Sequence, residues 1–244
     1  MTRDDLLPAL FPAGHDVGPG PHDTIAGTGR LADGGEAVVL GIAGGAPLGI
    51  ETAIVLAAQV LALAGRRDQA PLVLLVDTAS QRMARRDELL GLNEYLAHLA
   101  KCLHLAGTNG HRSIGILHGP AAAGAFIATV LATDILVAVP GAEPSVMDLP
   151  SIARVTKLDL ETLQRMAGST PIFAPGIEAL TRTGAVAQNW TDRAEFARRL
   201  QELLHQPASL ADERGRLGAE RGGRQAAARI AAMVQEQALC HART

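Results

Sequence analysis

Short apolar runs alternate with longer helix-like stretches along the middle of the chain. The short runs of Val, Leu and Ile are residues 37–42, 71–77, 113–119 and 134–140. Each is too short for an ordinary helix and predicts a buried strand. Between them, residues 50–65 and 88–107 predict long helices, and 120–132 opens with small residues and then becomes helical. Continuous apolar strands separated by helices are typical of a parallel sheet covered on both faces, so the pattern predicts right-handed βαβ units.

The pattern changes on both sides of this α/β core. Residues 12–35 are rich in Gly, Pro, His and Asp, so we expect residues 1–35 to form an ordered but irregular N-terminal arm. Residues 141–191 hold short segments broken by prolines. Residues 192–206 and 209–239 predict two amphipathic C-terminal helices. Because 244 residues fit one large domain, we expect residues 1–244 to form a single domain.

Composition narrows the classes of function. The chain has 25 acidic and 22 basic residues and a net charge of −3, with only 2% aromatic residues. Nucleic-acid binding normally requires a basic surface, so this composition argues against nucleic acid as the main partner. The start of the chain has Asp4 and Asp5 where a signal peptide would be basic, and the apolar run 50–64 is shorter than a membrane span. With two cysteines and no disulfide pattern, we expect a cytoplasmic protein with no membrane partner.

Candidate chemistry gathers in the loops that follow the predicted strands. These loops are GGAPLG (44–49), DTASQ (77–81) and HGPAAAG (118–124). In an open α/β sheet, ligands usually bind beyond the carboxyl ends of the strands. The third loop runs into a helix, where free N–H groups and the helix dipole stabilise a developing oxyanion or enolate. The alternative interpretation is close packing of helix on sheet, which also requires small residues.

Other polar residues indicate chemistry less directly. No GxSxG, Walker A, HExxH or GxGxxG motif follows a predicted strand. His98 and Cys102 have the spacing for half a metal site, but no third ligand lies nearby in the sequence, and a packed helix face explains them as well. His118 fits either a general acid or a buried, hydrogen-bonded side chain. Arg82, Arg85 and Arg86 fit either an anion-binding patch or a solvated basic face.

Several separated motifs, in a consistent order, resemble a known family. The strand ILHGPAAAGAF and the later ATDILVAVPGAEPSVM are similar to the acyl-CoA carboxyltransferase branch of the crotonase superfamily. Two longer stretches narrow the resemblance: VDTASQRMARRDELLGLNEYLAHLAKCL (76–103), and MDLPSIARVTKL (147–158) followed by STPIFAPG (169–176). Together they resemble the gamma (E) subunits of biotin-independent malonate decarboxylases. The resemblance covers residues 37–191.

This resemblance implies a fold and a reaction. The fold implied is an α/β, crotonase-like ββα-superhelix (the ClpP/crotonase spiral) with C-terminal helices. The reaction implied is decarboxylation of malonyl-S-acyl carrier protein to acetyl-S-acyl carrier protein and CO2, carried out together with a carboxyltransferase-like beta subunit. The thioester is carried on a phosphoribosyl-dephospho-CoA group of the carrier protein. The resemblance implies that this chain itself binds no cofactor, biotin or metal.

The resemblance also places site residues. The middle glycine of the crotonase turn falls on Gly124, whose N–H is one oxyanion donor, with Ala123 beside it. The second donor is expected in the loop after the preceding strand, namely at Thr78, Ala79, Ser80 or Gln81. We expect the remaining contacts with the CoA-type thioester and carrier from Gly44, Gly45, Gly119, Pro120, Met147, Arg82, Arg85 and Arg86.

One departure from the crotonase pattern bears on the reaction. The glutamate that hydratases use falls on Ile127, so the carboxylate that hydration needs is absent. A decarboxylase mainly has to stabilise an enolate, which agrees with this change. Two alternatives stay open: a stand-alone crotonase-like acyl-thioester hydrolase or isomerase, and a non-catalytic structural partner subunit. Ile127 counts against the first, and the sequence does not separate the second from a contributing half-site.

Overall fold

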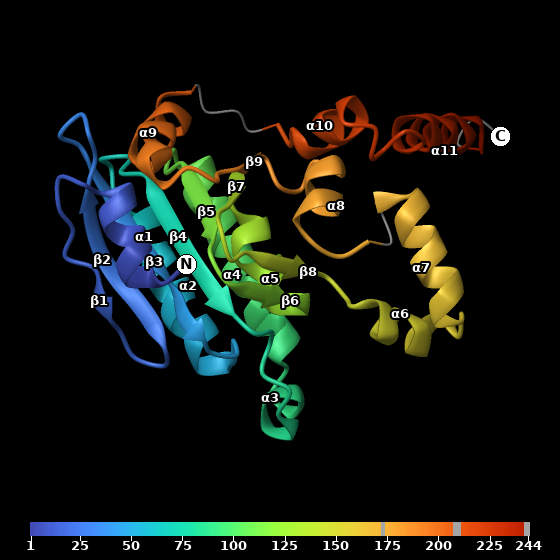
Figure 1. Ribbon diagram of the computed structural model, residues 1–244, viewed down its shortest axis with the longest axis horizontal. Coiled ribbons are helices and arrows are strands. Elements are labelled where there is room, and N and C mark those ends of the chain that lie inside the picture. Colours follow the sequence, from blue (N-terminus) through green and yellow to red (C-terminus); the bar gives the residue numbers. More distant parts are fainter. Residues whose placement is uncertain (172–173, 207–210, 242–244) are drawn as a thin grey trace.

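The computed structural model describes residues 1–171, 174–206 and 211–241 of the chain. A sheet of seven strands forms its centre, in the order β1-β2-β3-β4-β5-β7-β9 (Figure 1). The strands are β1 (Gly18–Pro19), β2 (Thr24–Arg30), β3 (Glu36–Gly45), β4 (Leu72–Thr78), β5 (Ser113–Leu117), β7 (Ile135–Ala138) and β9 (Gln188–Asn189). From β3 to β9 neighbouring strands are parallel, whereas β1 and β2 join antiparallel. The predicted parallel core is therefore confirmed.

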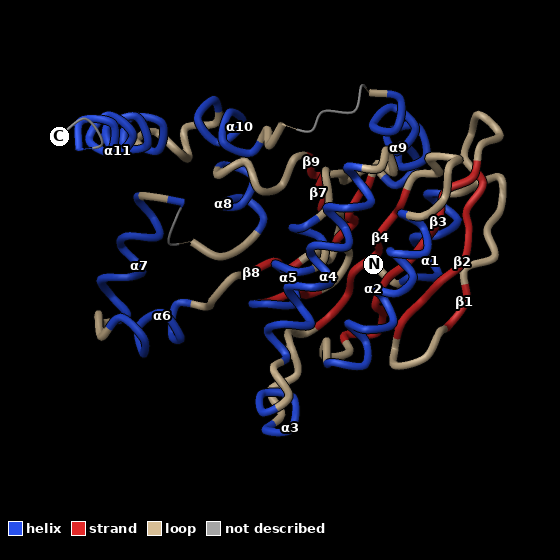
Figure 2. Tube along the Cα trace, turned by 180° about the vertical axis from the view of Figure 1, so that it is seen from behind, coloured by secondary structure: helices blue, strands red, loops and turns tan. Residues whose placement is uncertain are grey.

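Alternation along the buried strands divides the core into two layers. Within β4, Val73 and Leu75 face one layer, and Leu72, Leu74 and Val76 face the other. Because successive side chains of a strand point to opposite faces, a continuous apolar run needs cover on both sides. Helices α2 (Ile50–Ala64) and α4 (Leu92–Thr108) supply it on one face, as Figure 2 shows. Helices α1 (Arg3–Leu10) and α9 (Phe196–His205) supply it on the other.

A second, small sheet crosses the end of the central one. Its two parallel strands are β6 (Pro120–Ala122) and β8 (Glu143–Ser145), and β6 leads directly into helix α5 (Ala123–Ala128). The segment 120–132 is thus a short strand, a helix and a 3-10 turn at Val130–Ala132, not the single helix that its composition predicts. The pairing of β6 with β8 brings residues that follow Ser145 toward the start of α5.

The expected irregular N-terminal arm at 1–35 is wrong in part. Residues 3–10 form α1, whose Leu6, Leu7 and Leu10 are buried against the sheet and whose first turn is capped by Thr2. Residues 24–30 form β2, which pairs along its whole length with β3, from Thr24–Ile42 to Arg30–Glu36. Its glycines weaken the strand signal, but Gly29 is needed here because a side chain at that position would meet the Phe11 ring at 2.6 Å.

The outer helices also differ from the expectation. Residues 209–239 were expected as one amphipathic helix, but two helices form, α10 (Arg214–Glu220) and α11 (Ala227–His241). Gly222, with a φ of 73°, ends the first of them, since a left-handed residue stops a helix. Residues 207–210 lie outside the described ones. Between β8 and β9, the proline-broken segment holds α6 (Leu149–Thr156), α7 (Leu160–Ser169) and α8 (Ile177–Arg182).

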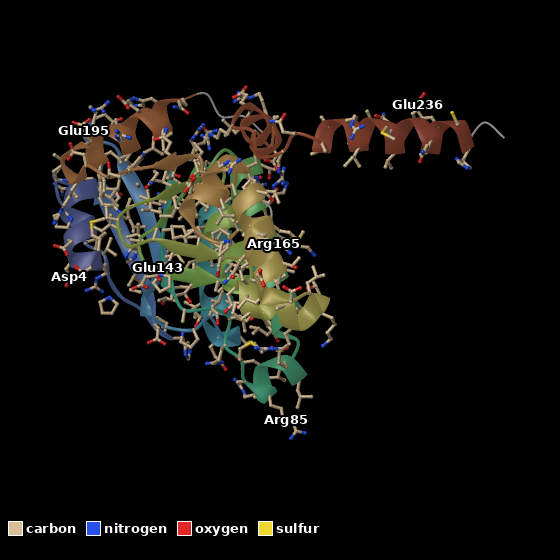
Figure 3. All side chains as sticks on the ribbon, turned by 45° about the vertical axis from the view of Figure 1, so that its right-hand side comes forward. Asp4, Arg85, Glu143, Arg165, Glu195 and Glu236 are labelled. Atoms are coloured by element: carbon tan, nitrogen blue, oxygen red, sulfur yellow. The ribbon has the colours of Figure 1, made fainter. Side chains whose placement is uncertain are left out.

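Helix α11 lies apart from the rest of the molecule. Every residue from Ala227 to His241 is exposed, apolar ones included. Figures 1 and 3 show the helix extending away from the sheet and its covering helices. Along the described ranges of the chain, no helix combines the length and apolarity that crossing a bilayer requires.

The contact of α9 with the sheet gives a test of the core. Phe196 is fully buried, and its ring lies 5.6 Å from that of Trp190. We expect Phe196→Ala to lower the free energy of unfolding by about 3–5 kcal/mol, because the truncation leaves a cavity. Urea denaturation of the purified chain measures this loss. Leu89→Ala, at a side chain that is 75% exposed, is the control and should change stability little. A loss below about 1 kcal/mol for Phe196→Ala would contradict the assignment of α9 to the core.

Candidate active site

The three loops that follow β3, β4 and β5 meet at one edge of the sheet, as the parallel arrangement predicts. Leu48 of the first loop donates its N–H to Ser80 O at 2.9 Å and accepts from Arg82 N at 2.8 Å. The Gly124 N–H donates to the side-chain Oε1 of Gln81 at 2.6 Å. Main-chain and side-chain hydrogen bonds thus join all three loops into one cluster, which we take as the candidate active site.

Gly124 lies in the first turn of α5, with its N–H directed at the loop after β4. A Cβ at this position would lie 2.6 Å from Gln81 Oε1 and 2.9 Å from Leu96 Cδ1. Only glycine therefore allows the Gln81 side chain to approach the main chain so closely. The preceding Ala123 adopts a left-handed φ of 51°, which sets the turn from β6 into the helix. The backbone here is held in an unusual conformation at the point where a donor is expected.

The loop after β4 presents its groups in different directions. Thr78 is buried, and its hydroxyl donates to Ala46 O, so it fixes the first loop. The Ala79 N–H donates to Gly45 O at 3.3 Å. The Ser80 N–H has no acceptor among the described residues, while its hydroxyl donates to Gln81 O at 2.9 Å. Of the four residues expected to hold the second donor, Ser80 and Gln81 both have an N–H without an acceptor among the described residues.

A carboxylate that the sequence analysis did not single out organises the glycines of the site. Asp77 Oδ2 accepts the Gly44 N–H at 3.1 Å. A Cβ on Gly119 would lie 2.2 Å from Asp77 Oδ1, so that glycine leaves room for the carboxylate. Gly44 and Gly45, the last residues of β3, both have left-handed φ values, 74° and 66°, and lie where the register with β4 shifts. The only signal in the sequence was an acidic residue at the end of an apolar strand.

His118 is a buried, hydrogen-bonded side chain. Its ring is 2% exposed, and Nδ1 lies 3.2 Å from Met1 O. Nε2 is also buried and has no hydrogen-bond partner within the described part of the chain. Burial lowers the pKa of this imidazole, so the ring is neutral at pH 7. These contacts favour the structural interpretation of His118 over the general-acid one.

The three arginines do not form one surface patch. Arg82 donates to the buried carboxylate of Asp87 through Nε at 2.6 Å and also pairs with Glu51 at the start of α2. Arg86 pairs with the same Glu51. The hydrogen bond from Arg82, then that from the main-chain N–H of Glu51 itself and that from Arg86, lowers the pKa of Glu51 to about 2. The side chain of Arg82 crosses Gly49, where a Cβ would meet its guanidinium carbon at 2.4 Å.

Arg85 differs from the other two arginines. It is the first residue of the short helix α3 (Arg85–Leu89), is exposed, and forms no ion pair with any residue in the described ranges. Figure 3 shows its side chain at the outer end of α3, pointing away from the body of the molecule. Met83 and Leu89 beside it are 79% and 75% exposed. The segment 83–90 therefore projects an apolar surface with one unpaired cation next to the site.

The remaining predicted residues lie near the start of α5. Pro120 begins β6 and is exposed, and Met147 follows its partner strand β8. Ile127 is half exposed on α5, so no carboxylate stands there.

The possible half metal site at His98 and Cys102 lies on α4. His98 Nε2 contacts Cys102 Sγ at 3.6 Å, and burial raises the pKa of that thiol. Within the described residues, no group of three or more His, Cys, Asp or Glu side chains is arranged to hold a metal ion.

Comparison with known proteins gives one curated relative and several similar structures. The relative is the malonyl-S-ACP:biotin-protein carboxyltransferase MADD of Malonomonas rubra, 27% identical over 183 residues, or 70% of this chain. The chain spans 63% of the length of that relative. A transcarboxylase 12S structure with hydrolysed methylmalonyl-coenzyme A has a TM-score of 0.66 at 18% identity, covering 83% of this chain and 39% of its own. That likeness shows the crotonase-type carboxyltransferase fold, as predicted.

Two structures of Pseudomonas malonate decarboxylase are more similar. A hetero-tetramer in complex with coenzyme A contains a chain with a TM-score of 0.78 and 26% identity, covering 96% of this chain and 98% of that one. The MdcD–MdcE hetero-dimer gives a TM-score of 0.74, also at 26% identity, with coverage of 97% and 100%. The family model of the malonate decarboxylase gamma subunit, MdcE, matches residues 43–238. This chain therefore belongs to the malonate decarboxylase gamma subunit family.

Proposed function

We propose that this chain pairs with a carboxyltransferase-like beta subunit to decarboxylate malonyl-S-acyl carrier protein to acetyl-S-acyl carrier protein and CO2. The observation that carries the proposal is the Gly124 N–H, which points into the site and already holds a carbonyl-type oxygen, that of Gln81, at 2.6 Å. A thioester carbonyl is the same kind of acceptor. The N–H groups of Ser80 and Gln81 on the neighbouring loop have no acceptor among the described residues and are the candidates for the second donor in this proposal.

The proposed chemistry places negative charge on the thioester oxygen. When the bond between the α-carbon and the carboxylate breaks, CO2 leaves and its bonding electrons form an enolate. Backbone N–H groups fixed in advance stabilise that oxygen more than they stabilise the neutral thioester. The α-carbon then takes up one proton to give the acetyl group. No base has to remove a proton from carbon, so a side chain such as Ile127 is compatible with the reaction.

The partners follow from the relatives. The Pseudomonas MdcE chain forms a hetero-dimer with MdcD, and the relative MADD is named for a malonyl-S-ACP substrate. We infer that this chain likewise pairs with a beta subunit and that the thioester arrives on the phosphoribosyl-dephospho-CoA arm of a carrier protein. In this proposal the chain binds neither biotin nor a resident cofactor. Both cysteines are free thiols, which suits a complex that works in the cytoplasm.

One observation favours a second possibility, a structural subunit with a vestigial site. The Gly124 N–H is satisfied within the chain, so it does not by itself require a substrate. In that case the beta subunit would supply all groups that act on the thioester. A substitution at Gly124 separates the two possibilities.

Association with the partner is the first outcome to test. Exposed apolar side chains lie on α11 (Ile230, Met233, Val234, Leu239) and around α6 and α7 (Val155, Leu158, Leu160). We expect these segments to bury, with the partner, about 2,000 Å² or more in total, as obligate interfaces do. Light scattering on the chain co-expressed with its beta subunit should show a stable complex. A stable monomer that ignores the partner would argue against the assignment.

The second test concerns the Gly124 donor. In Gly124→Val, the branched side chain displaces Gln81 and blocks approach of the thioester. We expect turnover of the assembled complex to fall by about 10²-fold or more, the usual scale for one lost oxyanion donor. Gly18→Val is the matched control, because no atom lies within 4 Å of a Cβ placed there. Full activity in an assembled Gly124→Val complex would favour the vestigial site.

The third test concerns the carrier protein, which is expected to be acidic. Arg82 and Arg86 are held by Glu51 and Asp87, so Arg85 remains as the cation available to it. We expect Arg85→Ala to raise the apparent Michaelis constant for malonyl-carrier by about two- to fivefold at low salt, with little change in turnover. The effect should shrink at high ionic strength, because salt screens exposed charges.

Arg67→Ala provides the control for this third test. Arg67 is exposed in the connection between α2 and β4, at the opposite end of the parallel strands. Malonyl-CoA serves as the second substrate, since an equal loss with it would indicate nucleotide binding by Arg85. Unchanged carrier kinetics at low salt would remove Arg85 from carrier recognition.

A further inference from the structure

We propose that Gln81 is a displaceable internal acceptor, whose side-chain oxygen occupies the Gly124 N–H until the thioester carbonyl replaces it. The inference rests on the proposed function, in which that N–H binds the thioester. It assigns to Gln81 a part different from the one expected from the sequence, where its backbone was a candidate donor. Its side chain acts instead as an occupant of the site.

The Gln81 side chain lies close against the main chain of Gly124. The N···O distance is 2.6 Å, and a Cβ at Gly124 would lie at that same distance from the Gln81 oxygen. The glycine is therefore needed for the Gln81 side chain as much as for a substrate. The side chain is half-buried, and Leu96 closes the space behind the glycine. A thioester oxygen that binds Gly124 N must take the place that Gln81 Oε1 holds.

The backbone of Gln81 is fixed, so the side chain is the part that can leave. Hydrogen bonds on either side join Ser80 O and Arg82 N to Leu48. The guanidinium of Arg82 is in turn held by the buried carboxylate of Asp87 and by Glu51. A movement of the whole loop would break these contacts. Rotation about the side-chain bonds of Gln81 breaks only the hydrogen bond to Gly124.

The chemistry of the two acceptors explains how such an exchange works. A primary amide oxygen is a stronger acceptor than a thioester oxygen, because nitrogen donates its lone pair to the carbonyl more than sulfur does, so the neutral thioester replaces Gln81 at some cost in hydrogen-bond energy. The enolate oxygen carries negative charge, and hydrogen bonds to ionised acceptors are roughly twice as strong as neutral ones. The enolate therefore displaces Gln81 more readily than the neutral thioester does. A satisfied N–H in the empty site also avoids the penalty of an unpaired buried donor.

The experiment measures equilibrium binding to the complex of this chain with its beta subunit. Acetyl-CoA carries the thioester carbonyl and cannot lose CO2, while free CoA has the same nucleotide arm and no carbonyl. Gln81→Met removes the acceptor and keeps the length of the side chain. We expect it to tighten acetyl-CoA binding by about three- to tenfold, the scale of one neutral hydrogen bond, and to leave CoA binding unchanged.

Two further variants test the direction and the specificity of this effect on acetyl-CoA binding. Gln81→Glu places an anionic acceptor on the Gly124 N–H and should weaken acetyl-CoA binding relative to CoA, the opposite direction. Gln164→Met, at an exposed glutamine of α7, is the matched control and should behave as the wild type. Hydrogen exchange of the peptide that contains Gly124 gives a readout independent of ligand. In the unliganded complex, exchange at Gly124 should be faster in Gln81→Met.

The outcomes separate this inference from the proposed function. Weaker acetyl-CoA binding in Gln81→Met would overturn it, since Gln81 would then be a strap that holds the two loops for the substrate. Unchanged acetyl-CoA binding in Gln81→Met would overturn it as well. If the wild-type complex bound neither acetyl-CoA nor CoA and also failed to decarboxylate malonyl-carrier, the proposed function itself would fail. Faster exchange in Gln81→Met would then still establish the contact between Gln81 and Gly124.

Discussion

The parallel register of β3, β4 and β5 is the constraint on which the candidate site depends. Leu40 pairs with Leu74 and Leu74 with Gly115, so the three strands end at nearly the same level. The loops that leave them must then meet at one edge of the sheet. Backbone hydrogen bonds of the buried ladders set this level, with one register shift between Ile42 and Gly45 at the end of β3. The register therefore sets where the Gly124 N–H and the candidate donors of the loop after β4 lie.

The ion pairs of Arg82 fix the position of the loop after β4 relative to the sheet and its helices. A loop of polar residues has few apolar contacts to hold it, and its flexibility would blur the position of any donor. Here the buried Asp87 and the half-exposed Glu51 fasten Arg82 to α2 and α3. Because the pKa of Glu51 lies at about 2, below its ordinary value of 4.5, the contribution of its charge is fully present at neutral pH and is lost as pH falls from 4.5 through about 2. The anchor is therefore constant across physiological pH.

Parts of this molecule follow directly from the sequence, and others do not, for physical reasons. The apolar runs predicted β3, β4, β5 and β7, since a strand buried on both faces leaves an unbroken apolar signature. Strand β2 gave no such signal because it is rich in glycine and threonine and is held mainly by backbone pairing with β3. Helix α1 was missed because its eight residues include a proline. Gly222 divides the last helical region, and a single glycine within an amphipathic pattern is easily taken as tolerated.

The residues of the candidate site also divide into features that the sequence predicted and features that it did not. Gly124 and the loop at 78–81 were placed by the resemblance, and the structure brings them into contact. The directions of the side chains followed from tertiary partners far away in the sequence. Arg82 turns inward because Glu51, 31 residues earlier, meets it there. Gln81 turns toward Gly124 because that position, 43 residues later, lacks a side chain. The local sequence pattern does not show such distant partners. The three arginines, which could form one basic patch by sequence, therefore have different roles: Arg82 and Arg86 are held in ion pairs, and Arg85 has no ion pair among the described residues.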